Sequence, residues 1–135
     1  MKPLKILLVD DDEIQRIKFK KVCKEIKSSN TIFEAENGEN ALTLLEDKNK
    51  PYDLIISDLN MPRMNGFELL LKLKKNDQYK NIPVVIMSTS NNPLDLKKCF
   101  DLGISGYFMK PLKYTEYAKK VISLLEYWGK SEVVY

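Results

Sequence analysis

The chain has 135 residues, 44% of them hydrophobic and 30% charged, with a formal net charge of +3 at pH 7. This size suits one core, so we expect a single domain over residues 1–135, with its core at about 4–128 and a short tail at 129–135. Histidine is absent, which excludes a Ser-His-Asp or Cys-His nucleophile and a His-ligated zinc site unless a partner supplies the imidazole.

The distribution of apolar and charged residues limits the location and the partners. No apolar run is long enough to cross a bilayer, and the N-terminal stretch lacks the apolar core of an export signal, so we expect a cytoplasmic protein that binds no membrane. The lysines are scattered along expected helices without interleaved aromatic residues, which argues against nucleic-acid binding. Cys23 and Cys99 lack a neighbour at metal-ligand or redox-motif spacing, so we expect reduced thiols in the core.

Short apolar runs alternate with segments of helical periodicity along the whole chain. In chain order the pattern predicts a strand at 5–9, a helix at 13–28, a strand at 31–35, a helix at 38–48, a strand at 53–57, a helix at 66–76, a strand at 83–87, a helix at 93–102, a strand at 106–109 and a helix at 113–128. Strict alternation with short connections predicts an α/β fold, a doubly wound three-layer sandwich around a parallel sheet.

The character of each run indicates its place in that sheet. The runs at 5–9, 53–57 and 83–87 are continuously apolar, which is typical of parallel strands covered on both faces. The run at 31–35 alternates apolar and polar residues, which suits a strand at the edge of the sheet.

Polar side chains follow four of the five expected strands. Asp10, Asp11 and Asp12 follow the first strand, Asp58 follows the third, and Ser88 and Lys110 come at the ends of the fourth and fifth. Singly, each has an ordinary explanation as a helix cap, a loop hydroxyl or a surface charge. Together they should meet, because the carboxyl ends of parallel strands form one edge of the sheet, where ligands bind.

Crowded carboxylates need a positive partner, because they raise one another's pKa. Mg²⁺ suits them, since it takes oxygen ligands and commonly binds one or two carboxylates plus phosphate oxygens. With Mg²⁺ present, Asp58 could attack phosphorus to form an aspartyl phosphate, while Lys110 neutralises the oxygens of the phosphoryl group and Ser88 donates a hydrogen bond to one of them. The sequence therefore predicts magnesium-dependent phosphoryl transfer at this edge.

The stretches LLVDDD, LIISDLNMPRMNGFELL, IPVVIMSTS and GISGYFMKP resemble the receiver domain of two-component response regulators, in particular stand-alone, CheY-like receivers. The likeness covers almost the whole chain, and STS and NMPRMNG are most similar to receivers that serve bacterial phytochrome-type kinases. It implies a flavodoxin-like (βα)5 sandwich with strand order 2-1-3-4-5. It also implies a phosphoacceptor that takes its phosphoryl group from a sensor histidine kinase or a histidine phosphotransfer protein and is not itself an enzyme.

The resemblance assigns roles to individual residues of the acidic site. It implies that Asp10 and Asp11 hold Mg²⁺ directly or through water, and that Asp12 is a less critical neighbour. Asp58 would be the phosphoacceptor and also a metal ligand, with the backbone carbonyl of Asn60 as a further ligand.

The resemblance also assigns the residues that transmit the signal. Ser88 would be the switch hydroxyl, Tyr107 the switch aromatic residue, and Lys110 the partner of the phosphoryl group, followed by a cis peptide bond to Pro111. Threonine is commoner at the position of Ser88, and a switch without the β-branch should have a looser rotamer. The surface formed by 93–102, 106–109 and 113–128 would change shape and signal to a partner.

The last expected helix has an unusually wide apolar face. Its apolar residues are Tyr114, Tyr117, Ala118, Val121, Ile122, Leu124, Leu125 and Trp128, and at 100° per residue they cover about 160°, against the roughly 100° of a single buried stripe. Two interpretations stay open. The face is either a generous core contact covered by the tail, or a homodimer surface that involves Leu124, Trp128 and residues 133–135.

Other functions are compatible with parts of the pattern. Asp10 and Asp12 after an apolar strand also open haloacid-dehalogenase-type phosphatases, in which Asp10 would be the nucleophile. Against this, paired aspartates after Lys110 are missing and Asp58 would have no role. A flavodoxin-like nucleotide-binding module is disfavoured because three aspartates at the first turn would repel phosphate. A receiver that acts only as a scaffold would not need this combination of acids, hydroxyl and lysine.

Overall fold

The computed structural model describes residues 2–132, which form a five-stranded parallel sheet covered by five helices. The strands are β1 (Lys5–Val9), β2 (Thr31–Ala35), β3 (Leu54–Ser57), β4 (Val84–Ser88) and β5 (Gly106–Met109). The helices are α1 (Glu13–Glu25), α2 (Gly38–Leu45), α3 (Gly66–Lys75), α4 (Pro93–Asp101) and α5 (Tyr114–Lys130). The strand order is β2-β1-β3-β4-β5, so the expected doubly wound fold and its order are confirmed.

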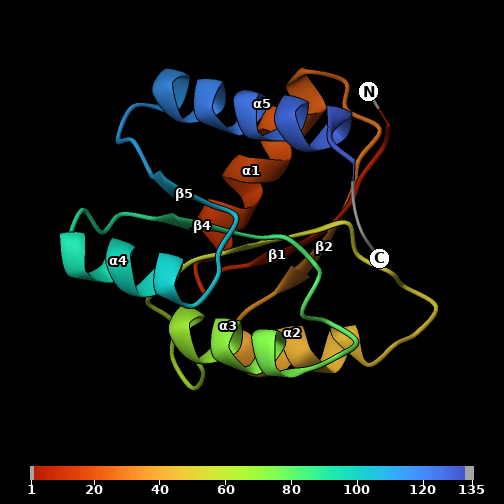
Figure 1. Ribbon diagram of the computed structural model, residues 1–135. Helices are drawn as coiled ribbons and strands as arrows, with labels where there is room; N and C mark the ends of the chain where they lie inside the picture. The colour runs from red at the N-terminus through yellow and green to blue at the C-terminus, as the bar shows by residue number, and fades with distance from the viewer. Residues whose placement is uncertain (1, 133–135) are drawn as a thin grey trace.

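The helices form one layer on each side of the sheet. Figure 1 shows α1 and α5 on one face and α2, α3 and α4 on the other. Side chains of successive strand residues point to opposite faces, and each face has its own buried cluster. In β1, Leu7 and Val9 pack toward α2 and α3, whereas Ile6 and Leu8 pack toward α1 and α5.

The burial of the strands follows the apolar pattern of the sequence. All residues of β3 and β4 are buried, and so are the last four of β1, because these strands lie inside the sheet with helices on both faces. In β2, an edge strand, only Ala35 is buried. The continuous runs and the alternating run therefore predicted the interior and the edge correctly.

The expected helix boundaries were wrong by up to three residues at the carboxyl ends. Helix α1 ends at Glu25 rather than residue 28, because Lys27 has a positive φ of 54°. The Ser28 N–H then donates to the carbonyl of Cys23, and the Lys27 N–H donates to the carbonyl of Lys24. These bonds form a Schellman motif without the glycine that usually occupies its left-handed position, so the end of α1 could not be predicted from a glycine.

The packing of α5 shows which residues of its wide apolar face belong to the core. Leu124 is 1% exposed and packs in the cluster below α1 and α5, so its proposed place on a dimer surface was wrong. Trp128 is half-buried against the same cluster, while Tyr127 is 64% exposed and packs edge-on against Trp128. The rest of the suggested surface, residues 133–135, lies outside the described part of the chain.

The two cysteines are buried, as expected, and neither forms a disulfide. Burial raises the pKa of each thiol to about 11, which suppresses the reactive thiolate. Among residues 2–132, no helix is long and apolar enough to span a membrane.

Candidate functional site

Three acidic side chains meet where β1 and β3 end. Val9 and Ser57 are partners in the parallel ladder, so the residues that follow them leave the sheet side by side. Carboxylate oxygens of Asp10, Asp11 and Asp58 lie within 4.8 Å of one another. Asp10 is buried, Asp58 is half-buried and Asp11 is exposed, so the cluster has one side open to solvent.

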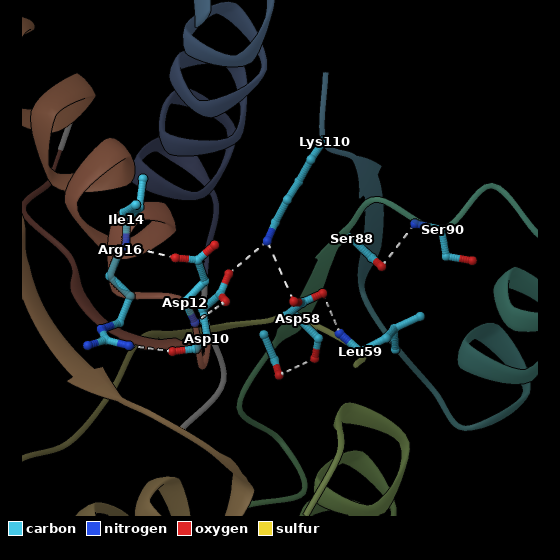
Figure 2. A network of polar contacts seen from close by, with 10 residues as sticks. Asp10, Asp12, Ile14, Arg16, Asp58, Leu59, Ser88, Ser90 and Lys110 are labelled. Atoms are coloured by element: carbon cyan, nitrogen blue, oxygen red, sulfur yellow. Dashed lines mark hydrogen bonds and ion pairs between the residues drawn. The ribbon is translucent and has the colours of Figure 1, made fainter. Parts of the chain in front are cut away.

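Lys110 supplies the positive charge closest to these acids. It follows β5, and its backbone N–H donates to the carbonyl of Ser88 over 2.7 Å. Its ammonium lies 2.7 Å from Oδ2 of Asp10 and 3.7 Å from Oδ2 of Asp58, with only 9% of the side chain exposed (Figure 2). The carboxyl ends of β1, β3 and β5 thus bring the acids and Lys110 together from distant parts of the chain.

The two oxygens of the Asp58 carboxylate have different surroundings. Oδ1 accepts a hydrogen bond of 2.8 Å from the Leu59 N–H, whereas Oδ2 faces Lys110. Burial raises the pKa of Asp58 above its ordinary value; Lys110 opposes this shift, and the charges of Asp10 and Asp11 add to it. The negative form of Asp58 is therefore only partly stabilised by the protein, and a further cation would favour it.

The backbone around Asp58 is closely packed. The Ser57 hydroxyl donates to the Asp58 carbonyl over 2.8 Å, and the Gly66 N–H donates to the carbonyl of Leu59 over 2.8 Å. A Cβ atom at Gly66 would lie 2.3 Å from the Asp58 carbonyl oxygen, so glycine is needed where α3 begins. Asn65 caps α3 in a capping box with Glu68, which fixes this close approach.

Ser88, expected to be the switch hydroxyl, is fully buried and engaged with its own loop. Its Oγ accepts a hydrogen bond of 3.1 Å from the Ser90 N–H (Figure 2). Tyr107, expected to be the switch aromatic residue, is half-buried against the cluster on the α2–α4 side. Its hydroxyl donates to the Ser90 carbonyl over 2.9 Å, so both residues contact Ser90.

The remaining expected site residues take different positions. Asp12 caps α1, with Oδ1 accepting from the Ile14 N–H over 2.9 Å, and does not belong to the cluster formed by the other acids. Asn60 is exposed, two residues beyond Asp58. The expected cis bond between Lys110 and Pro111 was wrong, because no peptide bond between described residues is cis. Trans is the intrinsically favoured form of such a bond.

Arg16 belongs to the site, although it was not among the site residues predicted from the sequence. Its Nη1 donates to the Asp10 carbonyl over 2.7 Å (Figure 2). Its Nε donates to Glu34 over 3.2 Å. It thereby ties the loop of the acids to α1 and to β2. One signal was available, because Arg16 occupies the buried stripe of α1 that continues with Phe19, Val22 and Cys23. A charged residue at such a position needs buried polar partners.

A sizeable pocket of the protein lies away from the cluster of acids and Lys110. A pocket of about 320 Å³ lies at the amino ends of β3 and β4, away from the acids, and near the carboxyl ends of α2 and α3. Its lining includes Leu45, Tyr52, Tyr79 and Ile82. The hollow beside Asp58 measures only about 10 Å³. We place the functional site at the acids, since a group approaching from solvent needs no deep cavity.

Comparison with known protein families identifies the family of this chain. The response regulator receiver domain matches residues 6–122. The chain belongs to this family. A receiver domain is a signalling module and not a catalytic enzyme, so the phosphatase alternative is set aside.

Two curated relatives illustrate the range of proteins that contain such a receiver domain. The chain is 38% identical to the two-component response regulator ARR17 of Arabidopsis thaliana over 132 residues, which covers 90% of this chain and 85% of that protein. It is 37% identical to the probable transcriptional regulator ycf29 of Pyropia yezoensis over 90% of this chain, but spans only 53% of that protein. Some relatives are therefore almost entirely receiver, whereas others continue well beyond it.

Solved structures of receivers superimpose closely on this one. The phosphorylated cyanobacterial phytochrome response regulator RcpA is similar with a TM-score of 0.92 and 26% identity, over 98% of this chain and 99% of that one. The Mn²⁺-bound response regulator Rcp1 is similar with a TM-score of 0.88 and 29% identity, over the same shares of the two chains. The fold described above is thus shared with one receiver that carries phosphate and with another that binds a divalent cation.

Proposed function

We propose that this receiver domain accepts a phosphoryl group on Asp58 in a Mg²⁺-dependent reaction and transmits the change to a partner. The observation that carries the proposal is the meeting of Asp10, Asp11 and Asp58 within 4.8 Å, with Lys110 against two of them. A receiver domain implies a histidine kinase partner. The donor we propose is a phosphohistidine on a sensor histidine kinase or a histidine phosphotransfer protein.

The donor set of the site fits a hard divalent cation. Asp10, Asp11 and Asp58 would hold Mg²⁺ through carboxylate oxygens, together with the backbone carbonyl of Asn60. Their excess negative charge, only partly offset by Lys110, supports this assignment, and so does the Mn²⁺-bound relative Rcp1. When bound, the ion would supply charge neutralisation at the phosphoryl oxygens.

The residues of this chain would divide the transfer step among them. A carboxylate oxygen of Asp58 forms the bond to phosphorus while the P–N bond to the donor imidazole breaks, and the imidazole keeps the electron pair of that bond. The ammonium of Lys110, already 3.7 Å from Asp58, balances the charge of the transferred group. Oδ2 is the better placed nucleophile, because Oδ1 is engaged by the Leu59 N–H.

The signal would pass through Ser88 and Tyr107 to the surface made by α4, β5 and α5. Ser88 would turn toward the phosphoryl group, and Tyr107 would move into the space it leaves. The phosphoryl group can bias the two states only by its difference in interaction with them. Several exposed apolar side chains on or beside this surface are available to a partner, namely Leu94, Leu96, Phe100, Met109, Leu112 and Tyr127.

Several finer assignments belong to the same proposal. We infer one receiver domain over residues 1–135, in the cytoplasm, and a phytochrome-type histidine kinase as the first donor to test, because RcpA is a phytochrome response regulator. A homodimer through α5 and the tail is a further candidate, now centred on Tyr127 and Trp128. Light scattering on Tyr127→Ala should give a lower mass than the unchanged chain if that dimer exists. An unchanged mass would count against it.

The decisive experiment uses acetyl phosphate as a small donor, with and without Mg²⁺, and intact mass as the readout. We expect the gain of one phosphoryl group with Mg²⁺, no gain without it, and no gain in Asp58→Asn. Asp12→Asn is the matched control, because asparagine caps a helix as well as aspartate and Asp12 lies outside the acid cluster. Labelling that persists in Asp58→Asn, or that disappears in Asp12→Asn alone, would contradict the assignment.

A further inference from the structure

Ser90 connects three parts of the molecule that the proposed switch must move. Its N–H donates to Oγ of Ser88 over 3.1 Å, and its carbonyl accepts from the Tyr107 hydroxyl over 2.9 Å. Its own hydroxyl donates to Oδ2 of Asp95, in the first turn of α4, over 2.7 Å. Ser90 therefore touches the switch hydroxyl, the switch aromatic residue and α4 at once.

The bond from Ser90 opposes the movement proposed for Ser88. Figure 2 draws the contact of the Ser88 hydroxyl oxygen with the Ser90 N–H and none between Ser88 and Asp58. If Ser88 turns to donate to a phosphoryl group on Asp58, the Ser90 N–H loses its acceptor. That N–H is only partly exposed, so leaving it unpaired costs free energy unless Ser90 also moves.

Asp95 restricts the movement of Ser90. The contact between the Ser90 hydroxyl and the Asp95 carboxylate is short and charge-assisted, the stronger class of hydrogen bond. Ser90 is half-buried, and so is Asp95. The position of the Asp95 carboxylate near the positive end of α4 further stabilises its charge.

Helix α4 is the helix best able to respond when this contact breaks. Cys99 is its only buried residue, whereas α2 has three and α5 has five. Few buried apolar contacts mean a low free energy of local opening. Two polar contacts therefore contribute much of the stability of the first turn of α4. The Leu94 N–H donates to Oδ1 of Asn92, and the Ser90 hydroxyl donates to Asp95.

We propose that Asp95 and Ser90 are positioning residues that keep the Ser88 hydroxyl directed away from Asp58 before phosphorylation, and that releasing this hydroxyl loosens the first turn of α4. The inference rests on the proposed function, because it concerns the regulation of the same site. In this proposal the hydrogen bond between Ser90 and Asp95 stabilises the unphosphorylated conformation. Neither side chain takes part in the proposed phosphoryl transfer. Weakening that bond should favour the phosphorylated conformation.

The test measures the affinity for beryllofluoride, a mimic of the phosphoryl group, in the presence of Mg²⁺, using ¹⁵N NMR of the full chain. We expect Asp95→Ala and Ser90→Ala each to tighten binding about three- to tenfold, because the lost contact is a charge-assisted but partly exposed hydrogen bond. Asp95→Asn, which keeps an acceptor oxygen, should restore most of the resting affinity. The double variant should tighten binding no more than Ser90→Ala alone, since Ser90→Ala already removes the contact with Asp95, along with the acceptor of the Asn92 N–H.

Asp101→Ala is the matched control, because Asp101 lies on the same helix and pairs at the surface with Lys97. It should leave the affinity for beryllofluoride unchanged. Amide exchange in the first turn of α4, without beryllofluoride, should be faster in Asp95→Ala than in Asp101→Ala. A merely structural role for Asp95 would weaken binding or leave it unaltered.

The two failures can be distinguished. If the unchanged chain takes neither beryllofluoride nor phosphoryl groups at Asp58, the proposed function fails and this inference falls with it. If the unchanged chain binds beryllofluoride but Asp95→Ala binds it equally or more weakly, the proposed function stands and the role of Asp95 and Ser90 is overturned.

Discussion

The ammonium group of Lys110 lies 2.7 Å from Oδ2 of Asp10, an ion pair with both side chains at least nine-tenths buried. Asp10 is also a proposed ligand of Mg²⁺. In the proposed site, Lys110 thus neutralises an oxygen that Mg²⁺ would use, and the two cations would compete for the Asp10 carboxylate.

This competition predicts opposite effects of Lys110→Ala on metal binding and on phosphorylation. We expect the variant to bind Mg²⁺ several-fold more tightly, because a positive charge beside the ligands is lost. We expect it to react with acetyl phosphate at least tenfold more slowly, because the charge on the transferred group is no longer balanced. Calorimetry and intact mass measure the two effects. Lys113→Ala, an exposed lysine nearby, should change neither, and weaker Mg²⁺ binding in Lys110→Ala would refute the competition.

Gly66 and Gly38 predict a contrast between two similar substitutions. In Gly66→Ala the new Cβ would lie 2.3 Å from the backbone carbonyl oxygen of Asp58, which cannot move without disturbing the site. In Gly38→Ala it would lie 2.6 Å from the side chain of Met64, which is flexible. We expect unfolding free energies lower by about 3 kcal/mol and by about 1 kcal/mol respectively, from urea denaturation. Equal losses of unfolding free energy would contradict this prediction, because they would mean that the backbone at Asp58 shifts as readily as the side chain of Met64.

We predict that removing the Arg16 side chain lowers the unfolding free energy more than removing an exposed lysine does. Arg16→Ala removes the donor to the Asp10 carbonyl and leaves Glu34 with Lys20 alone. We expect a loss of about 2 kcal/mol in unfolding free energy, because the Asp10 carbonyl loses the donor of a buried hydrogen bond. Lys20→Ala, which removes an exposed partner of the same Glu34, should cost less than about 1 kcal/mol. Similar costs for the two variants would show that the contact with Asp10 contributes nothing.

Glu34 predicts a dependence of stability on pH. Burial alone would raise the pKa of Glu34, but the hydrogen bonds and charges of Lys20 and Arg16 outweigh it and lower that pKa below its ordinary value. An acid with a lowered pKa in the folded state contributes stability above its unfolded pKa, about 4.3 for glutamate, and loses it as the pH falls through the folded pKa.

Glu34→Gln should therefore be less stable than the unchanged chain by less than about 1 kcal/mol near pH 6.5, since the side chain is partly exposed and screened by solvent. The difference should shrink as the pH is lowered below about 4.3. Urea denaturation across this range provides the measurement. Glu36→Gln, another exposed acid just beyond β2, serves as the control. A difference that grows toward low pH would contradict the sign of the shift.

Features set by local patterning were predicted well from the sequence. Continuous apolar runs identified β1, β3 and β4 as interior strands, because burial on both faces requires apolar residues at every position. The meeting of Asp10, Asp11 and Asp58 followed from the same reasoning, because parallel strands deliver their carboxyl ends to one edge.

Features that depend on how loops and whole elements pack were missed or predicted wrongly. Arg16 donates to the backbone carbonyl of Asp10, six residues before it, and Ser90 donates to the Asp95 carboxylate, five residues after it, but apolar periodicity does not reveal such polar pairs. Leu124 was assigned to a surface because the apolar face of α5 is wide, yet it is buried in the core cluster on the α1–α5 side of the sheet. Packing of whole elements decides such positions.

The sheet itself preorganises Asp58, the proposed phosphoacceptor, together with Asp10. The Asp10 N–H donates to the Ala35 carbonyl over 3.0 Å, and the Asp58 N–H donates to the Val9 carbonyl over 2.9 Å, so both acids continue the strand ladder by one residue. Their backbone entropy is lost when the chain folds and not when a donor arrives. The sequences of loops and outer helix faces can therefore change to fit a different phosphoryl donor while Asp10 and Asp58 keep their positions.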